Sequence, residues 1–328
     1  MKNSIKRVQS ENLFSALSNG RILRVAKTKY FAYAAAAFML ASCSNDEDLV
    51  PQDDLKDTPI TVTAGVAELT TRAGYEGTTT LPETFYLGID QVDDNYDYPN
   101  MLMTKAADAN TYTPASSLLW ANSTDEVSVT AATFSLEGAQ TLAVQPDQST
   151  ADGVKASDHL LMAATEVTPS ANGISVDFSH IMSKVILTIT LATEFNERVN
   201  PITDVKFMGT VASNSYTVGS GWETIATDAT ATDITPLYNA YTAPTTDKPN
   251  ATAEYEVILV PQTVAANGFT VVFSVGDRVF KWTSTSAVAL EGGNKYTLAL
   301  TAGKDLVSSA SFSASAWNTG KEFSGETE

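Results

Sequence analysis

The feature that most constrains the fold is a strict two-residue alternation of apolar and other side chains in the middle of the chain. Residues 174–180 (ISVDFSH) carry their large apolar side chains on even positions, and residues 185–191 (VILTITL) carry them on odd positions. Successive side chains of a strand point to opposite faces, so each run is typical of a β-strand with a buried face. The change of phase between residues 181 and 184 indicates a bulge or kink between two strand segments.

Shorter runs with the same alternation recur along the chain, and no long segment has helical periodicity. The dipeptide Gly276-Asp277 predicts a two-residue hairpin turn. Residues 209–253 look loop-rich. We predict further strands at residues 60–69, 85–89, 116–120, 127–136, 205–207, 255–260, 269–275, 278–283, 296–301 and 306–317.

Strands spaced by roughly 8–12 residues are typical of β-sandwiches. We therefore predict an all-β chain with two β-sandwich domains in series, at residues 60–170 and 171–328. The break between them is expected at Pro169-Ser-Ala-Asn-Gly173, which combines a proline, a glycine and small polar residues.

The N-terminus has the pattern of a targeting segment. Residues 1–29 contain seven of the 20 Lys and Arg residues, and residues 30–40 are eleven uncharged residues. That apolar run is shorter than the ~20 residues of a membrane-spanning helix but suits a signal peptide. Leu40-Ala-Ser-Cys43 resembles a bacterial lipobox. We predict a lipoprotein signal peptide at residues 1–42, lipidation of Cys43, and an acidic linker at residues 43–59.

Charge and cysteine content exclude several classes of function. The chain has 38 Asp and Glu against 20 Lys and Arg, a net charge of −18. Such a surface repels phosphate backbones, so we expect no nucleic-acid partner. Cys43 is the single cysteine, which rules out a disulfide within the chain and a Cys-rich zinc site. A lipid on Cys43 is the interpretation that fits its position.

Motifs that would indicate chemistry are missing from the sequence. It contains no nucleophile elbow, phosphate loop, zinc-protease motif or dinucleotide fingerprint, so we predict no enzyme activity, catalytic residue, cofactor or metal site. The loop at residues 93–97 (DDNYD) begins like an EF-hand. Its sixth position is Tyr98 instead of Gly and its twelfth is Thr104 instead of Glu, so it fails as an EF-hand. Irregular calcium binding by this loop stays open.

The two histidines are expected to be structural. His180 continues the apolar face of residues 174–178, which predicts a buried side chain bonded to the backbone. His159 follows Asp158 directly, but adjacent residues on a strand point to opposite faces, so these neighbours do not form an acid–base pair.

Five segments span nearly the whole mature chain, although each motif alone is weak. They are the lipobox at 40–43, Thr71-Arg72-Ala73 after a first strand, residues 157–161 (SDHLL) with 173–185, residues 259–263 (LVPQT), and residues 317–320 (WNTG). In their order along the chain, these segments resemble the fimbrillin family of Bacteroidales, the pilins and anchors of surface fimbriae.

The resemblance implies two transthyretin-like β-sandwich domains and export as a lipoprotein to the surface of the outer membrane. It further implies that an Arg-specific protease cuts between Arg72 and Ala73 and removes the first strand. The groove left behind would accept a donor strand, here residues 306–317, from a neighbouring subunit of a fimbria or pilus. The implied partners are other fimbrial subunits, the outer membrane through the lipid before cleavage, the protease, and glycans or proteins on host or bacterial surfaces.

Alternatives remain open at this point. The mature region has three arginines, of which only Arg72 directly follows a first strand, yet Arg72 could be an ordinary surface residue. Residues 306–317 could be an edge strand of their own domain. The competing hypothesis is an uncleaved surface lipoprotein, either a fimbrial anchor or a glycan-binding module.

Overall fold

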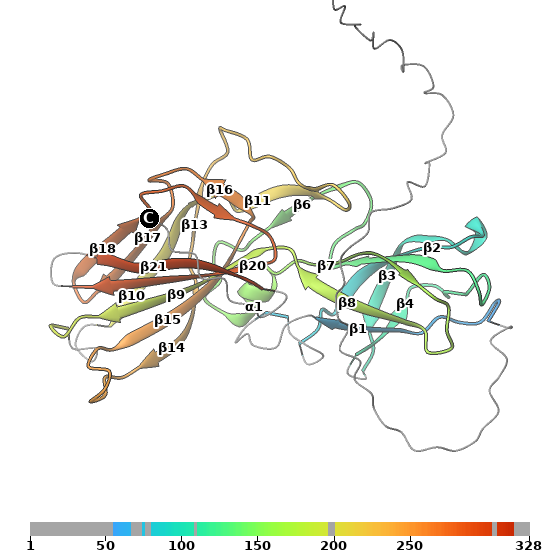
Figure 1. The fold of residues 1–328 in the computed structure, drawn as a ribbon, viewed down its shortest axis with the longest axis horizontal. Coiled ribbons are helices and arrows are strands. Elements are labelled where there is room, and N and C mark those ends of the chain that lie inside the picture. The colour runs from blue at the N-terminus through green and yellow to red at the C-terminus, as the bar shows by residue number, and fades with distance from the viewer. Residues whose placement is uncertain are drawn as a thin grey trace, which may run out of the picture. The chain divides into compact units, whose positions relative to one another are not determined.

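The computed structural model describes residues 55–66, 74–75, 80–107, 110–195, 201–303 and 307–317. Over these ranges the chain consists mainly of β-strands, which confirms the all-β class (Figure 1). The described residues contain one short α-helix, α1 (Ala151–Lys155), and one 3₁₀ turn, η1 (Asp94–Tyr96). No helix in these ranges has the length and the apolar character that crossing a membrane requires.

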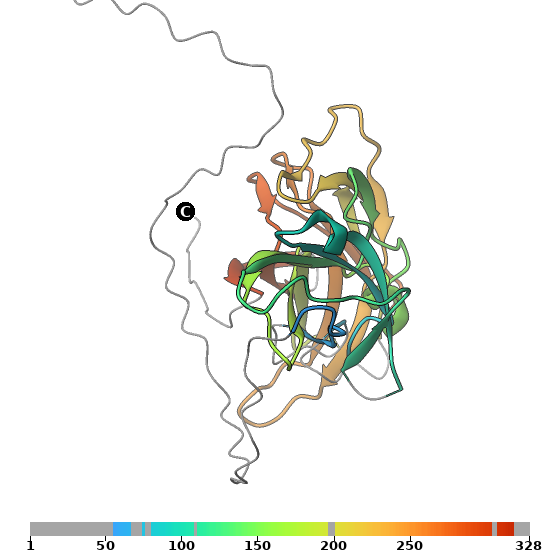
Figure 2. The same ribbon diagram turned by 90° about the vertical axis from the view of Figure 1, so that its right-hand side faces the viewer.

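Seven strands form a closed barrel in the order β1-β4-β3-β2-β5-β7-β8, which faces the viewer in Figure 2. Neighbours are antiparallel except β1 and β8, which run parallel and close the ring. The expected first sandwich is thus a single sheet whose two edges meet. The strands are β1 (Val62–Val66), β2 (Thr84–Asp90), β3 (Tyr98–Lys105), β4 (Thr111–Pro114), β5 (Val127–Ala132), β7 (Leu160–Val167) and β8 (Ile174–His180).

The barrel encloses its own apolar core. Phe85 of β2 and Phe178 of β8 are fully buried and meet edge to face, with ring centroids 5.2 Å apart. Residues 116–120, expected as a strand, are not one, although Leu119 forms an isolated bridge with Pro59. This segment still contributes Leu118 and Trp120 to the same core, which explains its apolar pattern.

The second half of the chain contains two larger sheets that share one apolar cluster. Leu187 of β9, Phe207 of β10 and Phe273 of β17 are fully buried in that cluster. The five-stranded sheet consists of β14 (Leu237–Thr242), β15 (Thr252–Leu259), β9 (Ser183–Leu191), β20 (Asn294–Ala302) and β21 (Val307–Ala316), in that order. The four-stranded sheet consists of β13 (Thr232–Ile234), β10 (Ile202–Thr210), β17 (Thr270–Val275) and β18 (Arg278–Thr283), in that order.

Two small sheets complete the described strands. One is β12 (Gly221–Trp222), β11 (Ser213–Thr217) and β6 (Ala139–Ala143), and the other is β16 (Gln262–Val264) with β19 (Val288–Leu290). The predicted hairpin at Gly276-Asp277 is confirmed, because Val275 pairs with Arg278 across the turn. Residues 209–253 hold β11 to β14, which are short or half-exposed strands without a clear apolar face.

The passage between the two halves lies later than the expected break near residue 170. β8 ends at His180 and belongs to the barrel, whereas β9 begins at Ser183 and belongs to the five-stranded sheet. The phase change in the sequence therefore marks the point where the chain leaves one sheet and enters another. The segment between β5 and β7 also contacts the second half of the chain, because β6 pairs with β11 and Val154 of α1 lies in the core of the second half.

Candidate assembly site

The first strand completes the barrel. Val62, Ala64 and Val66 point into the barrel core, with 1%, 3% and 6% of their surface exposed. Five residues of β1 pair with β8 on one side, and two pair with β4 on the other. Because β1 has neighbours on both edges, its loss would leave the facing edges of β4 and β8 without partners and open the apolar interior.

A glycine lets the chain pass close to β1 just before β8. The backbone N–H of Ile174 donates to the carbonyl oxygen of Thr61 at 2.8 Å. Gly173 has a φ of 76°, and a Cβ at this position would overlap the Thr61 carbonyl oxygen. Gly173 is therefore required for the parallel contact between β1 and β8, through both its conformation and its missing side chain.

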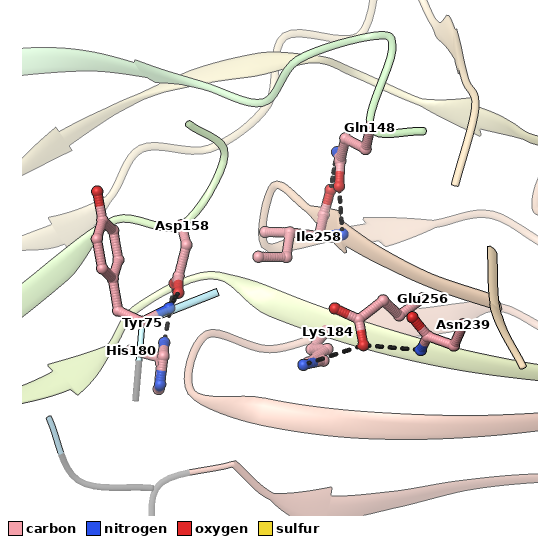
Figure 3. A network of polar contacts seen from close by, with 8 residues as sticks. All are labelled: Tyr75, Gln148, Asp158, His180, Lys184, Asn239, Glu256 and Ile258. Atoms are coloured by element: carbon pink, nitrogen blue, oxygen red, sulfur yellow. Dashed lines mark hydrogen bonds and ion pairs between the residues drawn. The ribbon is translucent and has the colours of Figure 1, made fainter. Parts of the chain in front are cut away.

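The predicted lipidation site, Cys43, and the predicted cleavage site, Arg72 and Ala73, lie outside the described residues. The next residues that the structure describes are Gly74 and Tyr75. The backbone N–H of Tyr75 donates to Oδ2 of Asp158 at 3.2 Å (Figure 3). Burial raises the pKa of the Tyr75 phenol above its usual 10.0, and the charge of Asp158 raises it further.

Asp158 also binds His180, across the barrel strands. Oδ1 of Asp158 accepts a hydrogen bond from Nδ1 of His180 at 2.8 Å, and both side chains are fully buried (Figure 3). His180 is buried as expected, and its Nδ1 is bonded to the Asp158 carboxylate. Asp158 precedes β7 and His180 ends β8, so the antiparallel pairing of Leu160 with His180 brings them together.

The ring of Trp317 covers this pair. It stacks on the His180 imidazole with centroids 3.9 Å apart and planes 6° from parallel, and it is 1% exposed. The Nζ atom of Lys184 lies 5.4 Å from the centroid of the same ring, a cation–π arrangement. Trp317 thus packs against a buried histidine and a buried lysine.

Lys184 has its own buried acidic partner. Nζ of Lys184 lies 3.6 Å from Oε2 of Glu256, and both side chains are almost completely buried. Nδ2 of Asn239 donates to the same carboxylate oxygen at 2.9 Å (Figure 3). Beside this group, Gln148 binds the backbone of Ile258 with both ends of its amide, at 2.7 Å and 2.8 Å.

The predicted donor strand lies on its own domain. β21 (Val307–Ala316) pairs antiparallel with β20 at both of its ends, with one register shift between Ala299 and Leu300, and it is the last strand in the order of the five-stranded sheet. Phe312 is half-buried and stacks on Tyr296 with centroids 5.5 Å apart. The structure thus matches the edge-strand interpretation of residues 306–317 within this chain, as far as they are described.

The acidic loop uses its carboxylates for local bonds. Oδ1 of Asp93 accepts from the backbone N–H of Asn95 at 3.1 Å, and Oδ1 of Asp97 accepts from that of Gln91 at 2.8 Å. Among the residues that the structure describes, no group of three or more His, Cys, Asp or Glu side chains is arranged to hold a metal ion.

A half-open groove lies at the opposite edge of the five-stranded sheet. Its volume is 720 Å³, and Tyr238, Tyr241, Tyr255 and Asp204 are among the residues that line it. A register shift between Tyr238 and Ala240 leaves Asn239 without a cross-strand partner, so that Tyr238 and Tyr241 lie on the same face of β14. Burial raises the pKa of Tyr255 to about 12, so its hydroxyl stays protonated at neutral pH.

Comparison with known proteins identifies the family to which the chain belongs. The model of the fimbrillin-like family matches residues 51–317, which is most of the chain. A search of curated proteins gives no match. A crystal structure of a candidate cell adhesion protein from Bacteroides uniformis has 18% identity and a TM-score of 0.54, covering 79% of this chain and 98% of that one.

A second crystal structure, of a candidate cell adhesion protein from Bacteroides ovatus, has 16% identity and a TM-score of 0.56. The match covers 83% of this chain and 99% of that one. These two likenesses concern the fold. The family match covers the barrel with its closing strand β1, the Asp158–His180 pair and β21 through Trp317. The chain belongs to the fimbrillin-like family.

Proposed function

We propose that this protein is a structural subunit of a cell-surface fimbria, exported as a lipoprotein on Cys43 and cut between Arg72 and Ala73. Membership of the fimbrillin-like family supports a fimbrial role at the cell surface. The finer steps are lipid attachment at the outer membrane, cleavage by an Arg-specific protease, and polymerisation with other fimbrial subunits by strand donation. Adhesion to host or bacterial surfaces follows from the assembled fimbria.

The observation that carries the proposal is the position of β1. It closes the barrel between β4 and β8, and it is joined to the rest of the chain by the segment that contains Arg72. One cut in that segment would leave β1 held by its two strand pairings, its buried side chains, and the backbone hydrogen bonds between residues 57–60 and 118–120. Its departure would create a slot, defined here as the space between β4 and β8 that β1 occupies.

β21 of a second copy is the proposed occupant of the slot. Over β21, Phe312, Ala314 and Ala316 alternate with serines, and this period of two suits a strand with one buried face. Unpaired N–H and C=O groups along β4 and β8 would bind the backbone of an incoming strand by β-augmentation. β21 is the end strand of its sheet, so it can leave β20 without breaking up the remaining four strands.

The decisive experiment is N-terminal sequencing and intact-mass measurement of the protein sheared from its native cells. A start at Ala73, within a ladder of detergent-resistant high-mass species, is the expected result. The variant Arg72→Ala should then keep its lipid and lose the ladder, while Arg198→Ala, with the arginine in the second half of the chain, should leave the ladder unchanged. A monomer that starts at acylated Cys43 would refute the proposal.

The groove beside β14 supports a second candidate function, in which an uncleaved surface lipoprotein serves as an anchor or binds a glycan. Tyr238 and Tyr241 are 52% and 39% exposed there, and the Asp204 carboxylate lies in the same lining. Exposed aromatic rings beside a hydrogen-bond acceptor suit the apolar faces and hydroxyl groups of a sugar. Tyr238→Ala should abolish retention on a glycan array, whereas Val279→Ala, at an exposed residue outside the groove, should not.

A further inference from the structure

The attachment of β21 depends on a few side chains. Nine of the ten residues of β21 are Val, Ser or Ala, and small side chains bury little surface. Only β20 pairs with this strand among the described strands. Besides the backbone bonds to β20, the large contacts are therefore the Phe312 ring and Trp317, the residue directly after the strand.

Trp317 is the more deeply seated of the two. Its backbone N–H donates to the carbonyl oxygen of Gly293 at 2.7 Å, and its ring lies on His180 and near Lys184. A fully buried indole contributes a large apolar contact area. Trp317 therefore fixes the C-terminal end of β21.

Two carboxylates hold the residues beneath Trp317 in place. Asp158 binds Nδ1 of His180 at 2.8 Å, and Glu256 lies 3.6 Å from Nζ of Lys184. We call His180, Lys184, Asp158 and Glu256 together the Trp317 seat. All four side chains are buried, so each depends on its partner to offset the loss of water.

One member of the seat also reaches the segment that follows Arg72. While Oδ1 of Asp158 holds His180, Oδ2 accepts the backbone N–H of Tyr75, and Tyr75 stands three residues after Arg72 in the sequence. The same carboxylate therefore contacts both the start of the processed chain and the support of its C-terminal strand.

We propose that the Trp317 seat retains β21 on its own sheet, and that Asp158 couples this retention to cleavage after Arg72. The inference rests on the proposed cleavage. Hydrolysis of the Arg72–Ala73 peptide bond consumes one water and leaves a carboxylate on Arg72 and an α-ammonium group on Ala73. That cation is two residues from Tyr75, a distance of at most about 7 Å along an extended chain.

The new cation changes the environment of Asp158. A positive charge attracts a carboxylate strongly where water is scarce, so the ammonium group competes with His180 for Asp158. Weaker support for His180 loosens the stack with Trp317 and frees the end of β21. Cleavage would then release the donor strand at the same time as it opens the slot that a donor strand fills.

Hydrogen exchange of the backbone amides, followed by mass spectrometry on the mature lipoprotein in detergent, tests the coupling. Arg198→Lys and Arg278→Lys restrict an Arg-specific protease to Arg72 in the mature chain. In the uncut protein, Trp317→Ala and Asp158→Asn should each speed exchange in residues 307–316 about tenfold or more, with β9 unchanged. Val279→Ala, at a residue of β18 that is 72% exposed, is the matched control and should leave both segments unchanged.

Cutting at Arg72 should speed exchange in residues 307–316 of the otherwise unaltered protein, and should add nothing in Asp158→Asn. If β21 still exchanges slowly in Trp317→Ala, the Trp317 seat does not retain the strand. If the cut speeds exchange equally in the unaltered protein and in Asp158→Asn, Asp158 does not couple retention to cleavage. If Trp317→Ala fails to fold, Trp317→Phe keeps a smaller ring on His180 and should give an intermediate rate. Native protein that starts at Cys43 would refute the proposed processing but not these exchange results, so the two failures are distinguishable.

Discussion

The indole of Trp317 lies parallel to the imidazole of His180, 3.9 Å away between centroids. His180 is the last residue of the barrel strand β8, and Trp317 directly follows the last strand of the five-stranded sheet. This contact joins the two ends of the described fold, because β8 is also the parallel partner of β1. The His180–Trp317 contact therefore connects the first strand, through its partner β8, with the end of the last strand.

The buried ion pair provides a direct test of the Trp317 seat. Lys184→Met leaves the carboxylate of Glu256 buried without its cation, and we expect a loss of about 3–5 kcal/mol in the free energy of unfolding. Lys184→Met combined with Glu256→Leu should lose much less than the two single changes added together, because both charges are then gone. Urea unfolding of the four proteins measures the coupling.

The control for that cycle is the ion pair Lys105–Glu83, whose acidic partner is exposed. Its charged atoms lie 4.0 Å apart, and the Glu83 side chain is 87% exposed. Lys105→Met should lower the free energy of unfolding by at most about 1 kcal/mol. A similar loss for Lys105→Met and Lys184→Met would contradict the role assigned to burial.

Gly173→Ala should weaken the closure of the barrel. The new methyl group overlaps the Thr61 carbonyl oxygen, and an alanine at a φ of 76° is strained as well. We expect a loss of about 1–3 kcal/mol and faster amide exchange in β1. Gly138→Ala is the matched control, because Gly138 also has a positive φ of 67° but a methyl group there would meet no atom within 4 Å. Equal losses in the two variants would show that strain alone, without the contact to β1, explains the effect.

His159 should make stability depend on pH. Its Nε2–H donates to the carbonyl oxygen of Ala143 at 3.0 Å, and burial lowers its pKa below the usual 6.5. As the pH falls through 6.5, the unfolded chain therefore takes up a proton before the folded chain does. The contribution of His159 is fully present above this pH and is lost as the pH falls toward the lower, folded-state pKa.

Thermal unfolding between pH 7.5 and pH 5 checks this expectation, at values roughly one unit or more to either side of an ordinary histidine pKa. His159→Gln keeps an N–H donor for Ala143 and has no titration in this range, so its melting temperature should fall less on acidification than that of the unaltered protein. Identical pH profiles would refute a lowered pKa at His159.

Gln148→Glu tests the clamp on β15. The amide of Gln148 is fully buried, and it donates to the carbonyl oxygen of Ile258 and accepts the N–H of the same residue. An ionised carboxylate cannot donate, so the Ile258 carbonyl would face a buried charge. We expect a loss of about 1–3 kcal/mol at pH 7 that shrinks on acidification, measured by urea unfolding. A loss that does not vary with pH would mean that the carboxylate reaches water.

Period-two alternation was sufficient to find the strands with one buried face. β8, β9, β17 and β20 all follow that pattern in the sequence, and their alternating apolar residues fill the cores. β14 was not predicted as a strand, because its tyrosines at 238 and 241 are exposed and its register shifts between them. A strand that is half-exposed at a groove has no apolar period to detect.

The phase change after His180 predicted a bulge or kink, and in the structure it marks the passage between two sheets. In this chain the change of face coincides with the direct passage from the barrel into the five-stranded sheet. The partnership of Asp158 with His180 was hidden for a related reason. The sequence excluded its neighbour His159 as the partner of Asp158 but did not indicate His180, which lies 22 residues away and is brought close by the pairing of β7 with β8. The Ser157-Asp158 dipeptide and the apolar run that ends in His180 were the sequence features that could have indicated the Asp158–His180 pair.

The parallel pairing of β1 with β8 also has a consequence for folding kinetics. Val62 pairs with Ile174, about 110 residues later, whereas β2 with β3 and β7 with β8 are neighbours along the chain. Closing so long a loop is slow, so the strand that is synthesised first should dock last. If β1 docks last, the barrel forms through a six-stranded state, and proteolytic removal of β1 would return the protein to a state that resembles it.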